Sequence, residues 1–353
     1  MVRIKQYIPA IAAILMVAIG LLLSFSQKEI HQEQLRKDYL DAFDTVTTII
    51  GYDETQENFN KKSNLLMDEL KRYHKLYDIY NSYDGINNLR TINQNAGIAP
   101  VKVDQEIIDL LNFSIELYDK TNGQTNIALG SVLKIWHNYR NAGIDNPSTA
   151  TLPPMELLEE ASKHCNIHDI IIDEDSSTVY LKDPEMSLDV GSIGKGYAVQ
   201  KVSEYAKELG YNNMVISVGG NICAIGPKID DTLWKFGVQN PDLESPQASI
   251  ASVNVKDTCL VTSGGYQRYY TVDGIDYCHL IDPDTLMPAN FCAAVTVITP
   301  HSGEADALST ALFCMTIEEG IELINSIPNA EALWVHEDGT ITYSANFEKY
   351  IAQ

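Results

Sequence analysis

Residues 187–197, Ser-Leu-Asp-Val-Gly-Ser-Ile-Gly-Lys-Gly-Tyr, place a carboxylate, three glycines and a lysine between an extended run and a predicted helix. Glycine lets a backbone approach another group closely or adopt positive φ. Lys195 lies where the helix should begin, and free N–H groups at such a position attract anions. The stretch is not a P-loop, because it does not have the form G-x-x-x-x-G-K-[ST]. It predicts either an anion-binding turn or a strand-to-helix connection whose glycines serve packing.

The charge of the chain limits its partners. Its 353 residues include 48 acidic and 25 basic ones, a formal net charge of −23 at pH 7. Proteins that bind nucleic acid present a basic face, so we expect no nucleic-acid partner. A phosphorylated ligand would be repelled at long range and would require a locally positive site. A metal ion, Lys195 or Arg268 could supply that positive charge.

The first residues have the pattern of a targeting segment. A basic head with Arg3 and Lys5 precedes an apolar run over residues 8–25, which fits either a membrane anchor or a cleaved signal peptide. We expect an uncleaved anchor over residues 1–27 with the rest of the chain exported. A charged, helix-compatible stalk is expected over residues 28–42, and one domain over residues 43–353.

The six cysteines form no metal-binding or redox pattern. None belongs to a C-x-x-C pair, and no cysteine precedes Cys165, so a lipid-modified N-terminal cysteine is not expected. An even number of cysteines in an exported chain permits disulfides. The apolar neighbours of residues such as Cys223 and Cys314 favour buried free thiols instead.

The order of the predicted elements indicates an α+β fold with a largely antiparallel sheet flanked by helices. Apolar residues at helical spacing predict helices over residues 54–80, 104–118, 196–210 and 303–315. Strands are predicted from β-branched or alternating runs, among them residues 43–52, 167–172, 178–181, 213–218, 222–225, 259–262 and 291–298. Hairpins outnumber β-α-β units, which favours antiparallel pairing. Residues 83–97 are polar and aperiodic, and they predict a long ordered loop.

Asp306 and Thr310 form the sharpest local pattern. They are four positions apart on a predicted helix, so both side chains project from one face. A carboxylate with a hydroxyl is an oxygen-only pair, which suits Mg²⁺ better than zinc. The alternative is an acidic residue near a helix N-terminus with Thr310 as a surface filler.

Two other polar positions have both a structural and a chemical interpretation. Arg268 ends the polar turn Thr-Ser-Gly-Gly-Tyr-Gln-Arg and either holds a phosphate bidentately or forms a surface ion pair. His279 lies near the end of a predicted strand and is either structural or a proton acceptor. No G-x-S-x-G elbow and no G-x-G-x-x-G motif occurs, so a serine hydrolase or a classical dinucleotide fold is unsupported.

Five segments in a fixed order resemble the ApbE family, the FAD:protein FMN transferases. They are Asp-Val-Gly-Ser-Ile-Gly-Lys-Gly-Tyr-Ala (189–198), Ser-Val-Gly-Gly-Asn-Ile-Cys-Ala-Ile-Gly (217–226), Thr-Ser-Gly-Gly-Tyr-Gln-Arg-Tyr (262–269), His-Leu-Ile-Asp-Pro (279–283) and Ala-Asp-Ala-Leu-Ser-Thr-Ala-Leu (305–312). The resemblance covers about residues 43–345. It implies an ApbE-like, T-fold-related domain.

The resemblance also implies an activity. FAD would be split, its FMN half would go to a Ser or Thr hydroxyl of a target flavoprotein as a phosphoester, and AMP would leave. Mg²⁺ would be required. The acceptors would be exported or membrane-bound redox subunits of Rnf-type or sodium-pumping complexes, which places the catalytic domain on the extracytoplasmic side of a bacterial cell membrane.

The resemblance assigns roles position by position. Asp306 and Thr310 match metal-binding side chains, Ser192 matches a residue whose backbone carbonyl binds the metal, and His279 matches the base that deprotonates the acceptor hydroxyl. The positions that match nucleotide or flavin contacts are Tyr83, Asn126, Ile127, Ala128 and Asp189. Lys195 and Arg268 would add positive charge around the phosphates.

Two positions depart from the family pattern. Family members often have Asp where this chain has Gly265 and where it has Asn126. Neither departure touches the metal pair. Two alternative functions use the same site: an FAD pyrophosphatase in which water replaces the acceptor hydroxyl, and an exported FAD-binding protein without catalysis.

Overall fold

The computed structural model describes residues 32–352. The predicted anchor over residues 1–27 therefore lies outside the described residues. Between residues 32 and 352, no helix combines the length and the apolar character that crossing a membrane demands.

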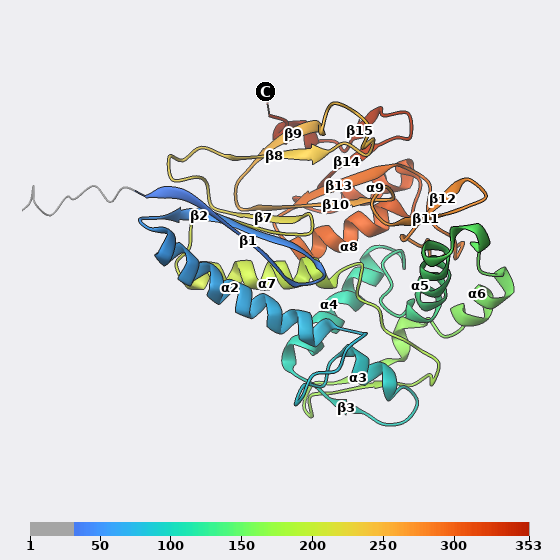
Figure 1. The fold of residues 1–353 in the computed structure, drawn as a ribbon. Helices are drawn as coiled ribbons and strands as arrows, with labels where there is room; N and C mark the ends of the chain where they lie inside the picture. Colours follow the sequence, from blue (N-terminus) through green and yellow to red (C-terminus); the bar gives the residue numbers. More distant parts are fainter. Residues whose placement is uncertain (1–31, 353) are drawn as a thin grey trace, which may run out of the picture.

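An eight-stranded antiparallel sheet forms the centre of the fold (Figure 1), in the order β1-β2-β6-β7-β10-β13-β14-β15. Its strands are β1 (Glu33–Ala42), β2 (Thr45–Asp53), β6 (Met214–Val218), β7 (Asn221–Ile225), β10 (Thr258–Gly264), β13 (Ala294–Thr299), β14 (Glu331–Val335) and β15 (Ile341–Tyr343). All residues of β13 and β14 are buried, as expected for central strands covered on both faces. The prediction of a largely antiparallel sheet is confirmed.

Three helices pack on one face of this sheet: α2 (Gln56–Tyr77), α7 (Gly194–Glu208) and α8 (Ser302–Phe313). In Figure 1 they lie together on one side, while the hairpin of β8 (Trp234–Gln239) and β9 (Ser249–Val255) lies on the other. The α2 helix begins at Thr55, whose side chain accepts a hydrogen bond from the Asn58 N–H. Such a cap stabilises a helix by about 1 kcal/mol.

The remaining helices and two small sheets complete the fold. The helices are α3 (Leu89–Gln94), α4 (Gln105–Lys120), α5 (Gly130–Asp145), α6 (Met155–Ser162) and α9 (Ile317–Ser326), with the short helices η1 (Pro147–Thr149), η2 (Ile167–Asp169) and η3 (Phe347–Tyr350). The small sheets are β3 (Val101–Lys102) with β5 (Thr178–Leu181) and β4 (Ile170–Asp173), and β11 (Tyr269–Val272) with β12 (Ile275–Cys278). The β11 strand contacts α5, which brings the 268–279 hairpin to the segment around residue 140.

Two secondary-structure predictions are wrong. The expected helix-compatible stalk over residues 28–42 is instead a strand from Glu33, because every second side chain over much of β1 packs inward and the backbone pairs with β2. The expected loop over residues 83–97 contains the α3 helix. The Asn88 side chain caps that helix by accepting a hydrogen bond from the Thr91 N–H. A cap of this kind stabilises a helix without adding apolar residues at helical spacing, so the hydrophobic pattern did not predict it.

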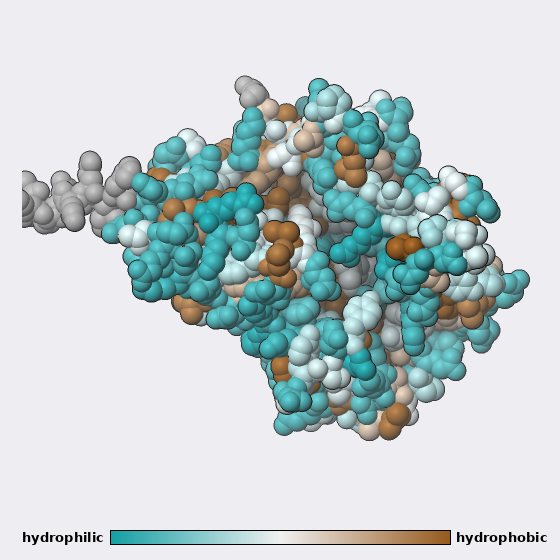
Figure 2. Space-filling model, viewed as in Figure 1, coloured by the Kyte–Doolittle hydropathy of each residue, from teal (hydrophilic) through white to brown (hydrophobic). Residues whose placement is uncertain are grey.

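The surface reflects the charged composition. Figure 2 shows hydrophilic residues over most of the face in view, with apolar residues confined to small separate areas. Isolated apolar residues on a surface are normal for a globular protein.

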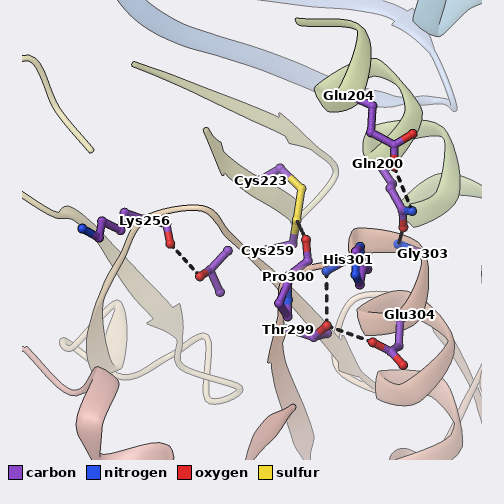
Figure 3. Close-up of a disulfide and its surroundings, with 11 residues drawn as sticks. Gln200, Glu204, Cys223, Lys256, Cys259, Thr299, Pro300, His301, Gly303 and Glu304 are labelled. Atoms are coloured by element: carbon purple, nitrogen blue, oxygen red, sulfur yellow. Dashed lines mark hydrogen bonds between the residues drawn. A yellow bond between two sulfur atoms is a disulfide. The ribbon is translucent and has the colours of Figure 1, made fainter. Parts of the chain in front are cut away.

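The expectation that the cysteines are free thiols is wrong for one pair. Cys223 on β7 and Cys259 on β10 are directly paired across the sheet and form a disulfide (Figure 3). They are 36 residues apart in sequence, so the bond becomes apparent only once the strand pairing is known. The other four, Cys165, Cys278, Cys292 and Cys314, are free.

Candidate functional site

The predicted metal pair lies where α7 begins against α8. A Cβ placed on Gly196 would come within 2.4 Å of both the Asp306 Cβ and the Ser302 carbonyl oxygen. Only glycine therefore permits this approach. The close approach lets the Gly196 N–H donate a hydrogen bond to Asp306 Oδ2 at 2.7 Å. Gly196, in the glycine-rich stretch of residues 187–197, thus allows α7 to pack closely against α8. This packing brings the N-terminus of α7 against the Asp306 carboxylate.

The Asp306 carboxylate is buried, with 5% of the residue exposed. Burial raises its pKa, and the nearby Lys195 ammonium and the Gly196 N–H oppose that rise. Among residues 32–352 it takes part in no ion pair. A buried carboxylate without a direct counter-ion is stabilised by a cation that binds it.

The oxygen donors around Asp306 suit Mg²⁺. Thr310 follows one turn later on α8 and is partly exposed, and Ser192 lies two residues before α7 begins. No cluster of three or more His, Cys, Asp or Glu residues that could hold a metal occurs in the described part of the chain. A hard cation with few protein ligands fits such a set of oxygens, whereas zinc sites usually include nitrogen or sulfur donors.

Lys195 is held beside this carboxylate. Its Nζ donates to Asn221 Oδ1 at 3.0 Å, and Asn221 follows the Gly219-Gly220 turn that joins β6 to β7. Both glycines have positive φ, 52° and 91°, as a two-residue hairpin turn of the I′ type requires. Asn221 Nδ2 is buried and has no hydrogen-bond partner within residues 32–352.

His279 lies at the end of β12, and its surroundings keep it neutral. Its N–H donates to the Arg268 carbonyl oxygen at 3.0 Å. Its Nδ1 is buried, and no group in the described chain hydrogen-bonds to it. Burial first, and then the positive charges of Arg268, Arg140 and Lys195, lower the pKa of His279 to about 4. A neutral imidazole with an unpartnered nitrogen can accept a proton.

The three cations around His279 have no acidic partners. Arg140 on α5, Lys195 on α7 and Arg268 before β11 take part in no ion pair among the described residues. The pKa of Arg140 is lowered first by burial and then by the charge of Arg268. Unpaired cations that repel one another are stabilised by an anion, so the arrangement can bind phosphate groups.

The predicted nucleotide-contacting segment lies directly against Asp189. The Asp189 N–H donates to the Ile127 carbonyl oxygen at 2.8 Å, and Asp189 Oδ1 accepts from the Gly191 N–H at 2.8 Å. Asn126 Oδ1 accepts from the Ala128 N–H at 2.8 Å, and its Nδ2 donates to the Cys165 carbonyl oxygen at 3.0 Å. Asn126 therefore shapes the loop through its amide, and Ile127 and Ala128 are fully buried.

A cavity of about 1040 Å³ opens beside this segment, and Asp189 forms part of its wall. Tyr80, His137 and Arg140 line the same cavity, with the Tyr80 hydroxyl 3.2 Å from His137 Nδ1. The volume suits an organic ligand of nucleotide size. Figure 2 also shows a hollow near the middle of the face in view, where Figure 1 places α8 and the start of α7.

Tyr83 is the one predicted aromatic contact, and its hydroxyl is engaged within its own segment. The Tyr83 hydroxyl donates to Asp78 Oδ2 at 2.7 Å, and Tyr83 does not line the large cavity, whereas Tyr80 does. Sequence reasoning missed Tyr80, His137, Arg140 and Asn221. Arg140 and His137 carried no signal, because they belong to an ordinary helical pattern. Asn221 lies within residues 217–226, one of the five segments that carry the family resemblance.

Comparison with known proteins gives one consistent family. A family model described as the ApbE family matches residues 43–334. A FAD:protein FMN transferase of Treponema pallidum is 32% identical over 271 residues, which cover 73% of this chain and 73% of that protein. One from Klebsiella pneumoniae is 28% identical over 283 residues, 78% of this chain and 82% of that protein.

Solved structures agree with this result. An ApbE protein from Thermotoga maritima has a TM-score of 0.78 at 27% sequence identity and covers 92% of this chain and 100% of its own. The flavin transferase ApbE from Vibrio cholerae has a TM-score of 0.75 at 22% identity, covering 91% of this chain and 100% of its own. At 22% identity, the similarity to the Vibrio cholerae structure concerns the fold alone. The family model matches most of this chain, and the relatives agree with that match. The chain therefore belongs to the ApbE family.

Proposed function

We propose that this protein is an FAD:protein FMN transferase that moves FMN from FAD to a Ser or Thr hydroxyl of a target flavoprotein and releases AMP. The observation that carries the proposal is the neutral, unpartnered His279 among three unpaired cations. Such a site combines a proton acceptor with a binding place for a pyrophosphate. Membership of the family supports the choice of FAD as the donor.

The chemistry requires one bond to form and one to break. The acceptor hydroxyl oxygen attacks the phosphorus of the FMN half, and the bond from that phosphorus to the bridging oxygen of AMP breaks. His279 accepts the hydroxyl proton, and AMP leaves with the bridging oxygen. Phosphoryl chemistry of this kind depends mainly on positioning and charge neutralisation. Arg268, Arg140 and Lys195 supply positive charge for both phosphates.

The proposed base and the proposed substrate support each other electrostatically. In the free protein, burial first and then the neighbouring cations hold the pKa of His279 far below its ordinary value. A bound pyrophosphate would offset the charge of these cations and raise the pKa of His279 from that low value. His279 would therefore become a better proton acceptor when the donor is in place.

The metal requirement is part of the proposal. Asp306 and Thr310 would hold Mg²⁺ through their side-chain oxygens, and Ser192 would do so through its carbonyl oxygen. Bound there, the ion would neutralise negative charge on the pyrophosphate. The burial of Asp306 supports this assignment, because a divalent cation would restore the ionised form that burial disfavours.

The flavin half of FAD is assigned to the cavity beside Asp189. Asn126, Ile127 and Ala128 would contact the nucleotide from the loop that supports Asp189. Tyr83 remains a proposed ring contact from the resemblance. Its bond to Asp78 makes Tyr80, which lines the cavity, the alternative aromatic residue.

The location and acceptor are proposed from the N-terminal pattern and the family. Residues 1–27 would anchor the chain in a bacterial cell membrane with the catalytic domain on the extracytoplasmic side. The acceptor would be an exported or membrane-bound flavoprotein subunit, of the Rnf or sodium-pumping type.

The test is to incubate the full chain with FAD and MgCl₂, with and without a candidate acceptor domain, and to analyse both by mass spectrometry. An FMN adduct on a Ser or Thr, released AMP and little free FMN support the transferase. Free FMN at an equal rate without acceptor would identify a pyrophosphatase. Bound FAD without turnover would identify a binding protein.

A further inference from the structure

A second cavity of about 430 Å³ lies away from the flavin site, between α2, α4 and α7. We name it the acidic cavity. Its walls carry five carboxylates, Glu69, Glu106, Asp109, Glu204 and Glu208, and among its lining residues only Lys201 is cationic. A pocket with this charge attracts cations.

Three of the five carboxylates, Glu69, Glu106 and Glu204, are held in place by neighbouring cations. Arg72 forms ion pairs with Glu69 through Nη2 and with Glu106 through Nη1, each at 2.8 Å. Lys201 Nζ lies 3.0 Å from Glu204 Oε2. Both cations are thus already engaged, and the five carboxylates remain in excess. Fixed acidic groups lose little freedom when they bind a ligand, which favours affinity.

Glu204 is also held from the side of α8. Its Oε1 accepts from Gln200 Nε2 at 3.2 Å, and Gln200 Oε1 accepts from the Gly303 N–H at 3.2 Å. Figure 3 shows this chain of contacts from Glu204 through Gln200 to the first turn of α8. The part of the wall that carries Glu204 is therefore pre-organised.

Two buried tyrosines supply the observation that separates this cavity from an ordinary acidic surface. Tyr73 and Tyr197 line the cavity with only 6% and 5% of each residue exposed. Neither hydroxyl takes part in a hydrogen bond within residues 32–352, and neither belongs to the fully buried unpartnered oxygens, so both remain accessible from the cavity. Burial, and then the nearby carboxylates, raise the pKa of Tyr73 to about 12. Both phenols therefore stay neutral and present free oxygens beside the carboxylates.

The tyrosine rings are already used by cations. Arg72 lies 5.1 Å from the Tyr73 ring centroid, and Lys201 Nζ lies 5.4 Å from that of Tyr197. An ammonium group matches the remaining groups, since its several N–H groups can donate hydrogen bonds to carboxylate and phenol oxygens. A bare metal ion does not match, because within the described chain these carboxylates form no metal-type cluster.

We propose that the acidic cavity binds an organic cation with primary ammonium groups, supplied either as a free polyamine or as a lysine side chain of a partner protein. The carboxylates provide the charge, and the hydroxyls of Tyr73 and Tyr197 accept hydrogen bonds. The proposal stands independently of flavin transfer, because none of these residues belongs to the flavin site.

The test is calorimetric titration of the purified full chain with spermidine and, separately, with Nα-acetyl-lysine methylamide. We expect saturable binding of one ligand per chain. Tighter binding of spermidine identifies a free polyamine as the source, and tighter binding of the lysine derivative identifies a side chain. Absence of binding by both would overturn the proposal, as would displacement of either ligand by an equal concentration of MgCl₂.

Matched variants separate the cavity from general attraction to an acidic protein. Loss of one charge in Glu204→Gln should weaken binding about tenfold, and loss of one hydroxyl in Tyr73→Phe about threefold. Glu159→Gln removes the same charge from an exposed position on α6 and should leave the affinity unchanged. Equal weakening by Glu159→Gln and Glu204→Gln would show non-specific attraction and contradict the proposal.

Discussion

The two ends of α7 carry opposite charge arrangements. At its start, Lys195 belongs to a group of cations without acidic partners, next to the buried Asp306. Toward its end, Lys201 is paired and Glu204 and Glu208 face a cavity with excess carboxylates. The net charge of −23 is therefore unevenly distributed. The local positive region would attract an anionic substrate and offset its repulsion by the rest of the protein. The charge of the whole chain says little about the charge of its site.

The largest effect is expected from Asp306→Ala, which removes the carboxylate from the positive end of α7. Because the proposed Mg²⁺ would lose its charged ligand, flavin transfer should fall by at least about 10³-fold. Lys195→Ala should be milder, since that ammonium supports the charge without binding the metal. Initial rates of acceptor labelling would measure both.

The matched control for Asp306→Ala is Glu322→Ala, which removes an exposed carboxylate on α9. It should transfer FMN at the normal rate. Transfer by Asp306→Ala at the rate of this control, with an unchanged melting temperature, would refute the metal assignment.

His279→Gln should reduce kcat about 100-fold, as expected for removal of a general base. Binding of FAD should change by less than about threefold, because the residue acts on the acceptor proton. Fluorescence titration with FAD and single-turnover transfer separate the two effects. His168→Gln alters an exposed histidine and serves as the control. A loss confined to FAD affinity would remove His279 as the base.

Arg140→Gln should weaken FAD binding about tenfold, since it removes one charge-assisted contact to a phosphate. It should also raise the pKa of His279, because one repelling charge is lost. Lys182→Gln removes a cation that lies in an exposed ion pair with Asp169, and FAD affinity should be unaffected. Equal affinities in the two variants would place Arg140 outside the phosphate site.

The pH profile tests the electrostatic account of His279. The pKa lies at about 4 in the free protein instead of the ordinary 6.5, so the imidazole is neutral above the lower value. The kcat/KM for FAD should therefore stay level between about pH 5 and 8 and fall only as pH drops through about 4. A fall that begins near the ordinary value would contradict the burial of His279 and the proximity of the three cations.

The smallest effect is expected at the acidic end of α7. Glu204→Gln should leave flavin transfer within about twofold of normal in the absence of polyamines, because charges this far from the site are screened by salt. Steady-state rates at physiological ionic strength would measure it. A loss comparable to that of Lys195→Ala would show that the two ends of α7 are not separate.

The glycine-rich stretch of residues 187–197 pointed to the site because a close approach between backbones requires glycine, and glycine is visible in the sequence. Asp306, Thr310 and the helix that carries them could be located from spacing, and the order of five segments indicated the family. Arg140 and Tyr80 could not be found this way, since nothing in their local pattern differs from an ordinary helix or loop. The Cys223–Cys259 disulfide depends on strand pairing, and the acidic cavity depends on three helices that are distant in the chain.

Mass spectrometry of an acceptor flavoprotein after incubation with the full chain, FAD and MgCl₂ tests the central claim most directly. The account predicts a covalent FMN adduct on one Ser or Thr, formed together with AMP and absent with Asp306→Ala. Hydrolysis of FAD to free FMN and AMP with an unmodified acceptor would contradict it.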